Sequence, residues 1–182
     1  MAVQKNLSTV EAFDEFIHLP ENAERLFEFI GGEIVEVPSN PYSSKISMRI
    51  GRFIGNFVDE NDLGHVTGEA GLYRVMNERY APDVGYISKI RQPALARHGA
   101  NPNPPDLAVE VVSPSDDPRQ LAIKISNYLA AGTVAWVMYP DDQQIDIHAP
   151  GQQVRTLGID DVLEGGTVLP GFQVAVKLLF KD

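Results

Sequence analysis

The segment that most constrains the fold is Leu107-Ala108-Val109-Glu110-Val111-Val112, an apolar run with one carboxylate inside it. Side chains alternate across a β-strand, so Glu110 would share one face with small and apolar neighbours. An unpaired carboxylate buried there would be strongly unfavourable, and it therefore needs a cation, hydrogen-bond donors or access to water. Two hypotheses follow: a glutamate at a strand edge, held by a salt bridge or by water, or a carboxylate that binds a metal ion.

The residues after this strand predict a helix and then a second strand. Asp117 and Pro118 are typical of a helix start, the helix would end near Ala131, and residues 134–139 form another apolar run. A strand, a helix and a strand in this order favour a right-handed crossover between parallel strands. Lys124 lies at the border of the apolar side of the helix, so its ammonium group can point back toward Glu110.

The remaining segments complete an α/β pattern. Residues 25–37 predict a β-hairpin with a Gly31-Gly32 turn, in which Glu28 shares a face with apolar neighbours and is expected on a partly buried side. Further expected elements are a helix over 43–59, strands at 65–67, 71–75, 81–88 and 145–148, a long surface loop over 91–105, and a closing turn and strand over 165–176. The pattern predicts one α/β domain over residues 1–182, with a mixed central β-sheet flanked by helices.

Composition narrows the possible functions. The 182 residues include no cysteine, which excludes thiolate metal sites, cysteine nucleophiles and disulfides. No segment approaches the roughly 20 apolar residues that span a bilayer, and the first residues lack the apolar core of a signal peptide. We therefore expect a cytoplasmic protein that does not enter a membrane.

Charge gives a second constraint. The formal net charge is −10, which opposes binding to a polyanion unless a local basic surface or a bound divalent cation reverses the field. Lys45, Arg49 and Arg52 recur at helical spacing within the helix over 43–59, and no acid lies between Glu36 and Asp59. This basic stripe is either a solvated helix face or a surface that contacts phosphates.

Three residues in sequence order form a recognisable chemical set: Asp83 at the start of a strand, Glu110 in the next strand, and Lys124 on the next helix. Carboxylates at the ends of adjacent strands can hold Mg²⁺ or Mn²⁺. Such an ion supports phosphodiester hydrolysis, and a nearby lysine can orient water or stabilise developing charge. Spacing alone carries little weight, since most chains contain these residue types in some order.

A family resemblance adds to this pattern. Pro82-Asp83 followed by Glu110-Val111-Val112 resembles the PD-(D/E)XK pattern of restriction-endonuclease-like nucleases. The chain resembles more closely the Uma-type family of "putative restriction endonucleases". The motifs that carry this resemblance are residues 26–34 (LFEFIGGEI), 105–115 (PDLAVEVVSPS), 124–132 (KISNYLAAG) with Trp136-Val137, and 169–172 (LPGF).

The resemblance implies a site, residue by residue. Asp83 and Glu110 match the family's metal-binding carboxylates, Glu28 matches its acidic residue in the early hairpin, and the carbonyl of Val111 could add a ligand. The superfamily lysine would fall at position 112, where this chain has valine, and Lys124 matches the place that the family's lysine takes on the following helix. Tyr128 matches a family aromatic residue, which we interpret as core packing.

The resemblance also implies a function. The chain is expected to be a restriction-endonuclease-like enzyme that uses Mg²⁺ or Mn²⁺ to hydrolyse nucleic acid, with DNA as the expected substrate and a homodimer as a plausible assembly. The alternatives are an inactive nuclease-fold module that binds nucleic acid or a protein, and a hydrolase of smaller phosphodiesters. Because the chain has no separate specificity domain, recognition is expected from loops such as residues 91–105, or from a partner.

Overall fold

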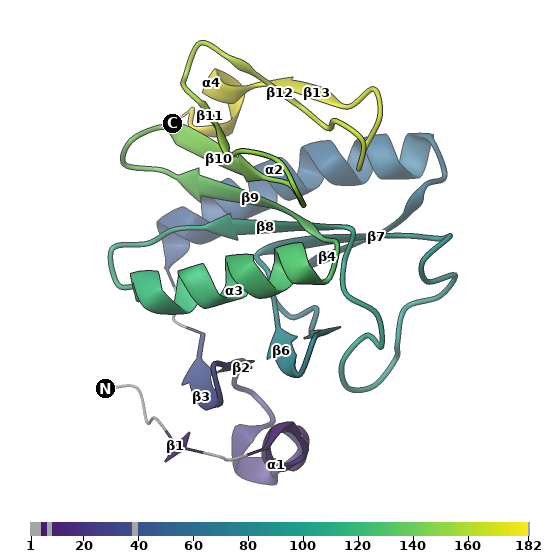
Figure 1. The fold of residues 1–182 in the computed structure, drawn as a ribbon, viewed down its shortest axis with the longest axis vertical. Coiled ribbons are helices and arrows are strands. Elements are labelled where there is room, and N and C mark those ends of the chain that lie inside the picture. Colours follow the sequence, from purple (N-terminus) through teal and green to yellow (C-terminus); the bar gives the residue numbers. More distant parts are fainter. Residues whose placement is uncertain (1–4, 7–8, 38–39, 182) are drawn as a thin grey trace.

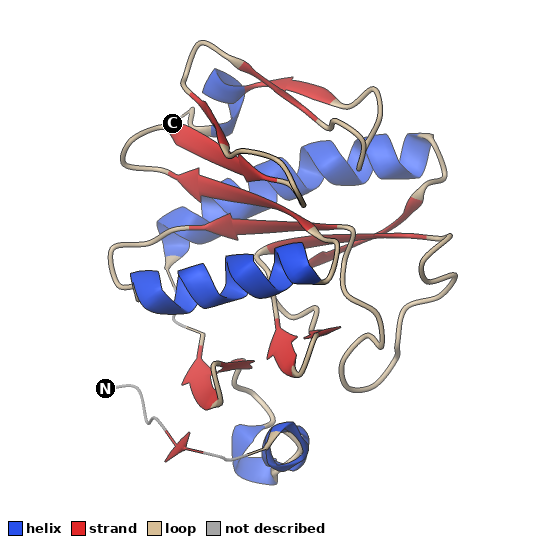
Figure 2. Cartoon of the chain, in the orientation of Figure 1, coloured by secondary structure: helices blue, strands red, loops and turns tan. Residues whose placement is uncertain are grey.

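The computed structural model describes residues 5–6, 9–37 and 40–181, and it contains a central mixed sheet between two long helices (Figures 1 and 2). The strand order of this sheet is β11 (Arg155–Leu157), β10 (Gln144–His148), β9 (Val134–Tyr139), β8 (Leu107–Val111), β7 (Val84–Ser88) and β4 (Gly64–Gly68). Only β8 and β9 pair in parallel within this sheet of the described chain, through the predicted crossover; the other neighbours are antiparallel. The predicted fold class is therefore confirmed.

The two faces of β8 are covered by different helices, as the alternation of its side chains predicts. Leu107, Val109 and Val111 belong to the core beneath α2 (Pro41–Glu60). Ala108 belongs to a second core that includes Tyr128 of α3 (Pro118–Ala130). Glu110 alternates with Val109 and Val111, so it lies on the α3 side of the sheet.

A second, smaller sheet lies next to α3, below it in Figure 1. Its strand order is β1 (Lys5–Asn6), β3 (Glu33–Glu36), β2 (Phe27–Ile30), β6 (Glu78–Tyr80) and β5 (Tyr73–Val75). The β2–β3 hairpin turns at Gly31 and Gly32, whose φ angles of +60° and +81° suit glycine. Phe13 of α1 (Val10–Phe16) packs on this sheet in a third, separate core. The expected hairpin is thus present, and it carries Glu28 in β2.

Several boundaries differ from the sequence expectations. Helix α2 begins at Pro41 because the Asn40 side chain accepts hydrogen bonds from two backbone N–H groups of its first turn, and proline suits the first helical position. Strand β6 was not predicted, and it separates β5 from β7. The C-terminal part contains the short pair β12 (Val162–Glu164) and β13 (Gln173–Ala175), followed by α4 (Val176–Leu179), where only one strand was expected. A 3₁₀ turn (Pro20–Asn22) follows α1.

None of the helices formed by the described residues combines the length and the apolar character needed to cross a membrane.

Candidate active site

The pairing of β7 with β8 brings Asp83 and Glu110 to the same end of the central sheet. Val84 pairs with Val109 in the antiparallel register, so the residues just before β7 lie beside the last residues of β8. Asp83 Oδ2 accepts a hydrogen bond of 2.7 Å from the backbone N–H of Val111. Asp83 is therefore fixed to the strand that carries Glu110, with Val111 between them.

Both oxygens of Glu110 have donors from α3. Lys124 Nζ lies 2.8 Å from Oε2, and the Tyr128 hydroxyl donates a 2.8 Å hydrogen bond to Oε1. Glu110 is only 7% exposed and Lys124 only 6%, so these contacts are almost free of water. The contact expected between Lys124 and Glu110 is present, and it explains how the carboxylate is tolerated inside an apolar strand.

Glu28 reaches the same lysine from the hairpin. Its Oε1 accepts a 2.7 Å hydrogen bond from the backbone N–H of Ala81 and lies 2.9 Å from Lys124 Nζ. The ammonium group of Lys124 thus lies between the carboxylates of Glu28 and Glu110, each of which has a side chain no more than 10% exposed. Segments far apart in the sequence, β2, β8 and α3, meet at this one cation.

Two tyrosines enclose this contact. The rings of Tyr80 and Tyr128 meet edge to face at 5.3 Å, and Lys124 Nζ lies 5.8 Å from the centre of the Tyr80 ring. The side chain of Asn127 donates a 2.7 Å hydrogen bond to the Tyr80 hydroxyl. Tyr128 is fully buried, so its predicted core packing is confirmed, but its bond to Glu110 was missed. The sequence offered one indication of this bond, because Tyr128 lies one helical turn after Lys124 and so projects from the same side of the helix.

Burial shapes the protonation of the site. It raises the pKa of Asp83 to about 6, although the bond from Val111 N–H opposes the shift. Burial also raises the pKa of Glu110 to about 8, against the lowering effect of Lys124. For Lys124 burial lowers the pKa, but the charges of Glu110 and Glu28 outweigh it and raise the pKa above its usual value. The lysine therefore stays charged, while Asp83 and Glu110 bind protons more tightly than ordinary carboxylates.

The donor set fits a hard divalent cation in charge and atom type. Glu28 and Glu110 contact the ammonium group of Lys124, and Asp83 is bonded to the same strand as Glu110, so full ionisation of the three carboxylates would leave a formal charge of −2 in a mostly buried site. The backbone hydrogen bonds described above fall on one carboxylate oxygen each, Oδ2 of Asp83 and Oε1 of Glu28. Within the described ranges, however, no three His, Cys, Asp or Glu side chains already surround one point as ligands would. Lys124 takes the place between Glu28 and Glu110.

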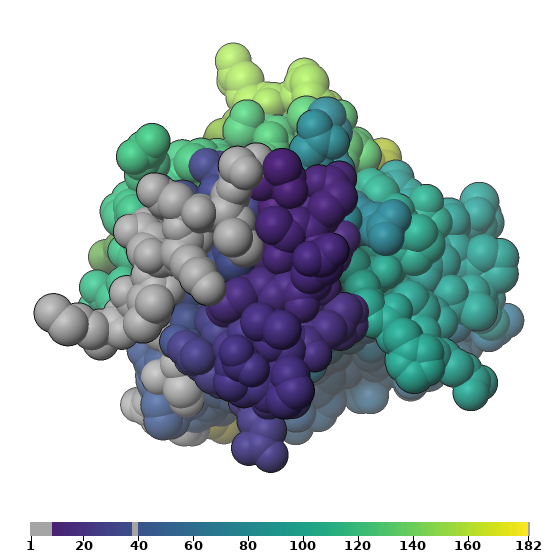
Figure 3. All heavy atoms as spheres, turned by 90° about the horizontal axis from the view of Figure 1, so that it is seen from below, coloured from purple at the N-terminus to yellow at the C-terminus, as the bar shows by residue number. Residues whose placement is uncertain are grey.

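The loop over 91–105 lies away from this site. It leaves the end of β7 and returns to the start of β8, whereas Asp83 and Glu110 lie at the other ends of these strands. In the space-filling view from below, the loop residues lie to one side of the N-terminal segment (Figure 3). Gln92 and Asn101 are buried and bonded to each other at 2.9 Å, so the loop has an ordered interior. The loop therefore does not line the carboxylate site, and the expectation that it contributes to recognition stays a prediction.

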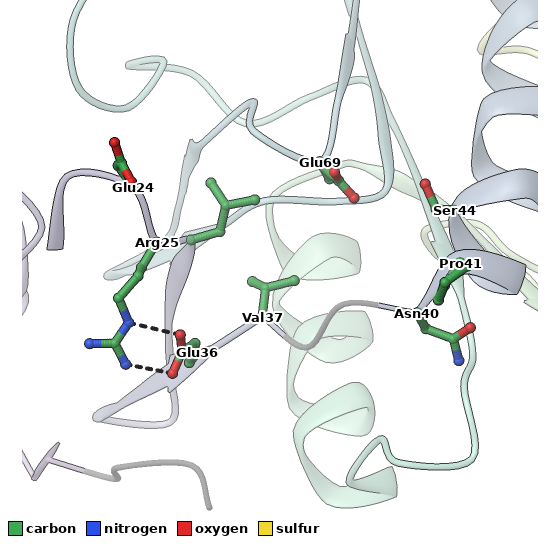
Figure 4. Close-up of a pocket in the computed structure, with 9 residues that line it drawn as sticks. Glu24, Arg25, Glu36, Val37, Asn40, Pro41, Ser44 and Glu69 are labelled. Atoms are coloured by element: carbon green, nitrogen blue, oxygen red, sulfur yellow. Dashed lines mark hydrogen bonds and ion pairs between the residues drawn. The ribbon is translucent and has the colours of Figure 1, made fainter.

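A cleft of about 330 Å³ lies next to the hairpin and the start of α2, and it contains none of the four predicted site residues (Figure 4). Its rim includes Glu24, Glu36 and Glu69, and Arg25 already forms a two-point ion pair with Glu36 at 2.6 and 2.8 Å. An acidic cleft without a free cation does not favour a phosphate group.

Comparison with known proteins decides the family. The model of the Uma2 family, described as "Putative restriction endonuclease", matches residues 13–177. This chain belongs to the Uma2 family. The Uma2-family chain also resembles a solved structure titled "a putative nuclease belonging to DUF820", from Anabaena variabilis ATCC 29413. That likeness has a TM-score of 0.79 and 23% identity, and it covers 92% of this chain and 96% of the other.

No curated protein matches the chain. Family membership supports a nuclease function for the Uma2-family chain in general terms, and the solved structure shows that the fold is shared.

Proposed function

We propose that this Uma2-family protein is a metal-dependent endonuclease that hydrolyses phosphodiester bonds of nucleic acid, with DNA as its substrate, in the cytoplasm. The observation that carries the proposal is the position of Lys124, whose ammonium group lies 2.8 Å from Glu110 and 2.9 Å from Glu28. A lysine supplied by α3 thereby reaches the carboxylate of β8, although Val112 occupies the usual lysine position of the superfamily pattern.

In this proposal Asp83 and Glu110 hold Mg²⁺ or Mn²⁺, with the carbonyl of Val111 as a further ligand and Glu28 assisting directly or through water. Such an ion, when bound, polarises a phosphodiester oxygen and lowers the pKa of its water. These three carboxylates come from segments that the two sheets and α3 hold in place, and their side chains would have to close around the ion because Lys124 lies between Glu28 and Glu110.

The other residues of the site act on charge and orientation. Lys124 remains protonated, so it can orient the attacking water or stabilise the negative charge that develops on the phosphate. Tyr128 donates to Glu110 and so limits the rotation of that carboxylate. Asp83, whose pKa is near 6, is mostly ionised at neutral pH and is available as a ligand. A homodimer would bring two such sites to the two strands of a duplex.

The test is cleavage of plasmid DNA and of single-stranded DNA with Mg²⁺ or Mn²⁺ by the wild type, Glu110→Ala and Lys124→Ala. We expect cleavage that requires the metal and falls by about two orders of magnitude or more in both variants. Folding of each variant is checked by circular dichroism. A wild type that binds DNA without cutting it would indicate an inactive binding module. Cleavage of small phosphodiesters alone would indicate the other hydrolase class, and variants that cut as well as wild type would refute the site.

A further inference from the structure

The cations of the chain divide into paired and unpaired sets. Five lysine or arginine side chains in the described part form ion pairs with carboxylates: Arg25, Arg79, Lys89, Arg91 and Lys124. By contrast, no carboxylate of the described residues lies within ion-pair distance of nine others: Lys45, Arg49 and Arg52 on α2, Lys177 and Lys181 near the C-terminus, and the scattered Arg74, Arg97, Arg119 and Arg155. The unpaired cations on α2 form the basic stripe described above, for which the sequence allows two roles, a solvated helix face or a surface that contacts phosphates.

Two acid-free segments supply five of these nine unpaired cations, namely those on α2 and near the C-terminus. Residues 37–58 and 165–181 contain no aspartate or glutamate. Since the whole chain has a formal charge of −10 and these segments contribute +5, the rest of the chain carries −15. Five of the nine cations without an ion-pair partner among the described residues thus come from two segments that are more than a hundred residues apart in the sequence.

The fold brings the two segments together. The guanidinium group of Arg49 donates a 3.2 Å hydrogen bond to the carbonyl of Leu179 and another bond to the carbonyl of Lys181. The rings of Phe57 and Phe172 meet at 5.6 Å, which joins the same segments further along α2. The C-terminal residues therefore lie on α2 beside its stripe, and we call the five side chains of Lys45, Arg49, Arg52, Lys177 and Lys181 the basic surface.

Most of the basic surface faces solvent. Lys45, Arg52, Lys177 and Lys181 are exposed, and Arg49 is partly exposed because it also holds the C-terminal carbonyls. Lys45, Arg49 and Arg52 lie at i, i+4 and i+7, so they project from one side of α2. Met48, which is 71% exposed, lies in the same stretch of the helix. The opposite side of α2 is the core stripe, which cannot bind a partner.

We propose that the basic surface binds the phosphate backbone of the nucleic acid that the active site cuts, an inference that rests on the proposed function. The remaining charge of −15 repels a polyanion, so attraction must come from a local positive field. Cations without carboxylate partners can neutralise phosphates without first breaking an ion pair. Helix α2 covers the face of the central sheet opposite to α3 (Figure 1). The basic surface therefore contacts the backbone away from the cut bond and carries no sequence information.

The test measures binding of a short DNA duplex to the full chain, without divalent metal, as a function of salt. Lys45→Ala/Arg52→Ala is compared with Arg97→Ala/Arg155→Ala, which removes the same charge from exposed arginines elsewhere. We expect the first variant to lose about tenfold or more in affinity near 0.1 M salt, and the slope of log K against log salt to fall by about two. The control variant should keep the affinity and the salt dependence close to those of the wild type.

Each outcome separates this inference from the proposed function. If both double variants lose the same DNA affinity, or neither loses any, the proposed role of the basic surface is refuted even if the wild type cuts DNA. A wild type that binds through this surface but never cuts would refute the nuclease proposal alone. If Lys45→Ala/Arg52→Ala instead converts a dimer into a monomer in sedimentation and leaves DNA binding unchanged, the surface is an interface between two copies and the inference is wrong.

Discussion

Replacing Lys124 by methionine removes the cation that two buried carboxylates share. The contacts are 2.8 and 2.9 Å, and the three side chains are between 7 and 10% exposed. Breaking a buried ion pair from one side costs about 3–5 kcal/mol, because a charge is left without a partner. We therefore expect Lys124→Met to lower the free energy of unfolding by about 3–5 kcal/mol at pH 8 in metal-free buffer, as measured by urea denaturation.

The loss should be smaller at pH 5. Burial already raises the pKa of Glu110 to about 8, and removal of Lys124 raises it further, so the carboxyl group is protonated and neutral in acid. The matched control is Lys89→Met, which breaks an ion pair with Asp62 whose side chains are 43% and 86% exposed, and which should cost less than about 1 kcal/mol. If Lys124→Met costs no more than Lys89→Met at pH 8, the buried cluster does not exist in solution as described.

Three further predictions concern protonation, the tyrosines and backbone packing. Burial raises the folded-state pKa of Asp83 to about 6 and that of Glu110 to about 8, so the folded metal-free protein binds more protons than the unfolded chain over roughly pH 4–8. The contribution of Asp83 and Glu110 to the free energy of unfolding is then present in acid and is lost as the pH rises to 8. Urea denaturation midpoints that stay constant or rise over this pH range would contradict the prediction. Tyr128→Phe should slow DNA cleavage about tenfold or more because Glu110 loses a hydrogen-bond donor. The control Tyr80→Phe should change the rate little, since the Tyr80 hydroxyl contacts no carboxylate of the described residues. Equal cleavage rates for the two variants would refute the role of Tyr128 in orienting Glu110. Gly64→Ala should cost about 2 kcal/mol or more, since its Cβ would collide with a backbone carbonyl of β7, and an unchanged melting temperature would argue against this packing.

The parts of the site that sequence predicted were those fixed by local periodicity. Alternation along β8 correctly placed Glu110 opposite Val109 and Val111, and the helical arc of α3 correctly directed Lys124 toward the sheet. The Gly31-Gly32 turn set the hairpin register and with it the buried side of Glu28. In each case the constraint acts over a few residues.

What sequence missed depends on contacts between distant segments. Strand β6 is three residues long, and its buried Arg79 is neutralised by Asp14, 65 residues earlier, which no local pattern reveals. The hydroxyl of Tyr128 could be assigned to Glu110 only after α3 was placed on β8. The position of the loop over 91–105 was predictable in principle, because a loop that follows β7 and precedes β8 must lie at the end of the sheet away from Asp83.

The central proposal is that Asp83 and Glu110, with Glu28 assisting, hold one divalent cation while Lys124 keeps its charge beside it. The most direct measurement is Mn²⁺ binding to the purified protein without DNA, followed by electron paramagnetic resonance, for wild type, Asp83→Asn and, as a control, Asp106→Asn. Asp106 is a partly exposed carboxylate paired with Arg91 at the other end of the sheet. We predict one tightly bound ion per chain, affinity reduced at least about tenfold in Asp83→Asn, and wild-type affinity in the control. Mn²⁺ binding that is absent in the wild type, or unchanged in Asp83→Asn, would contradict the account.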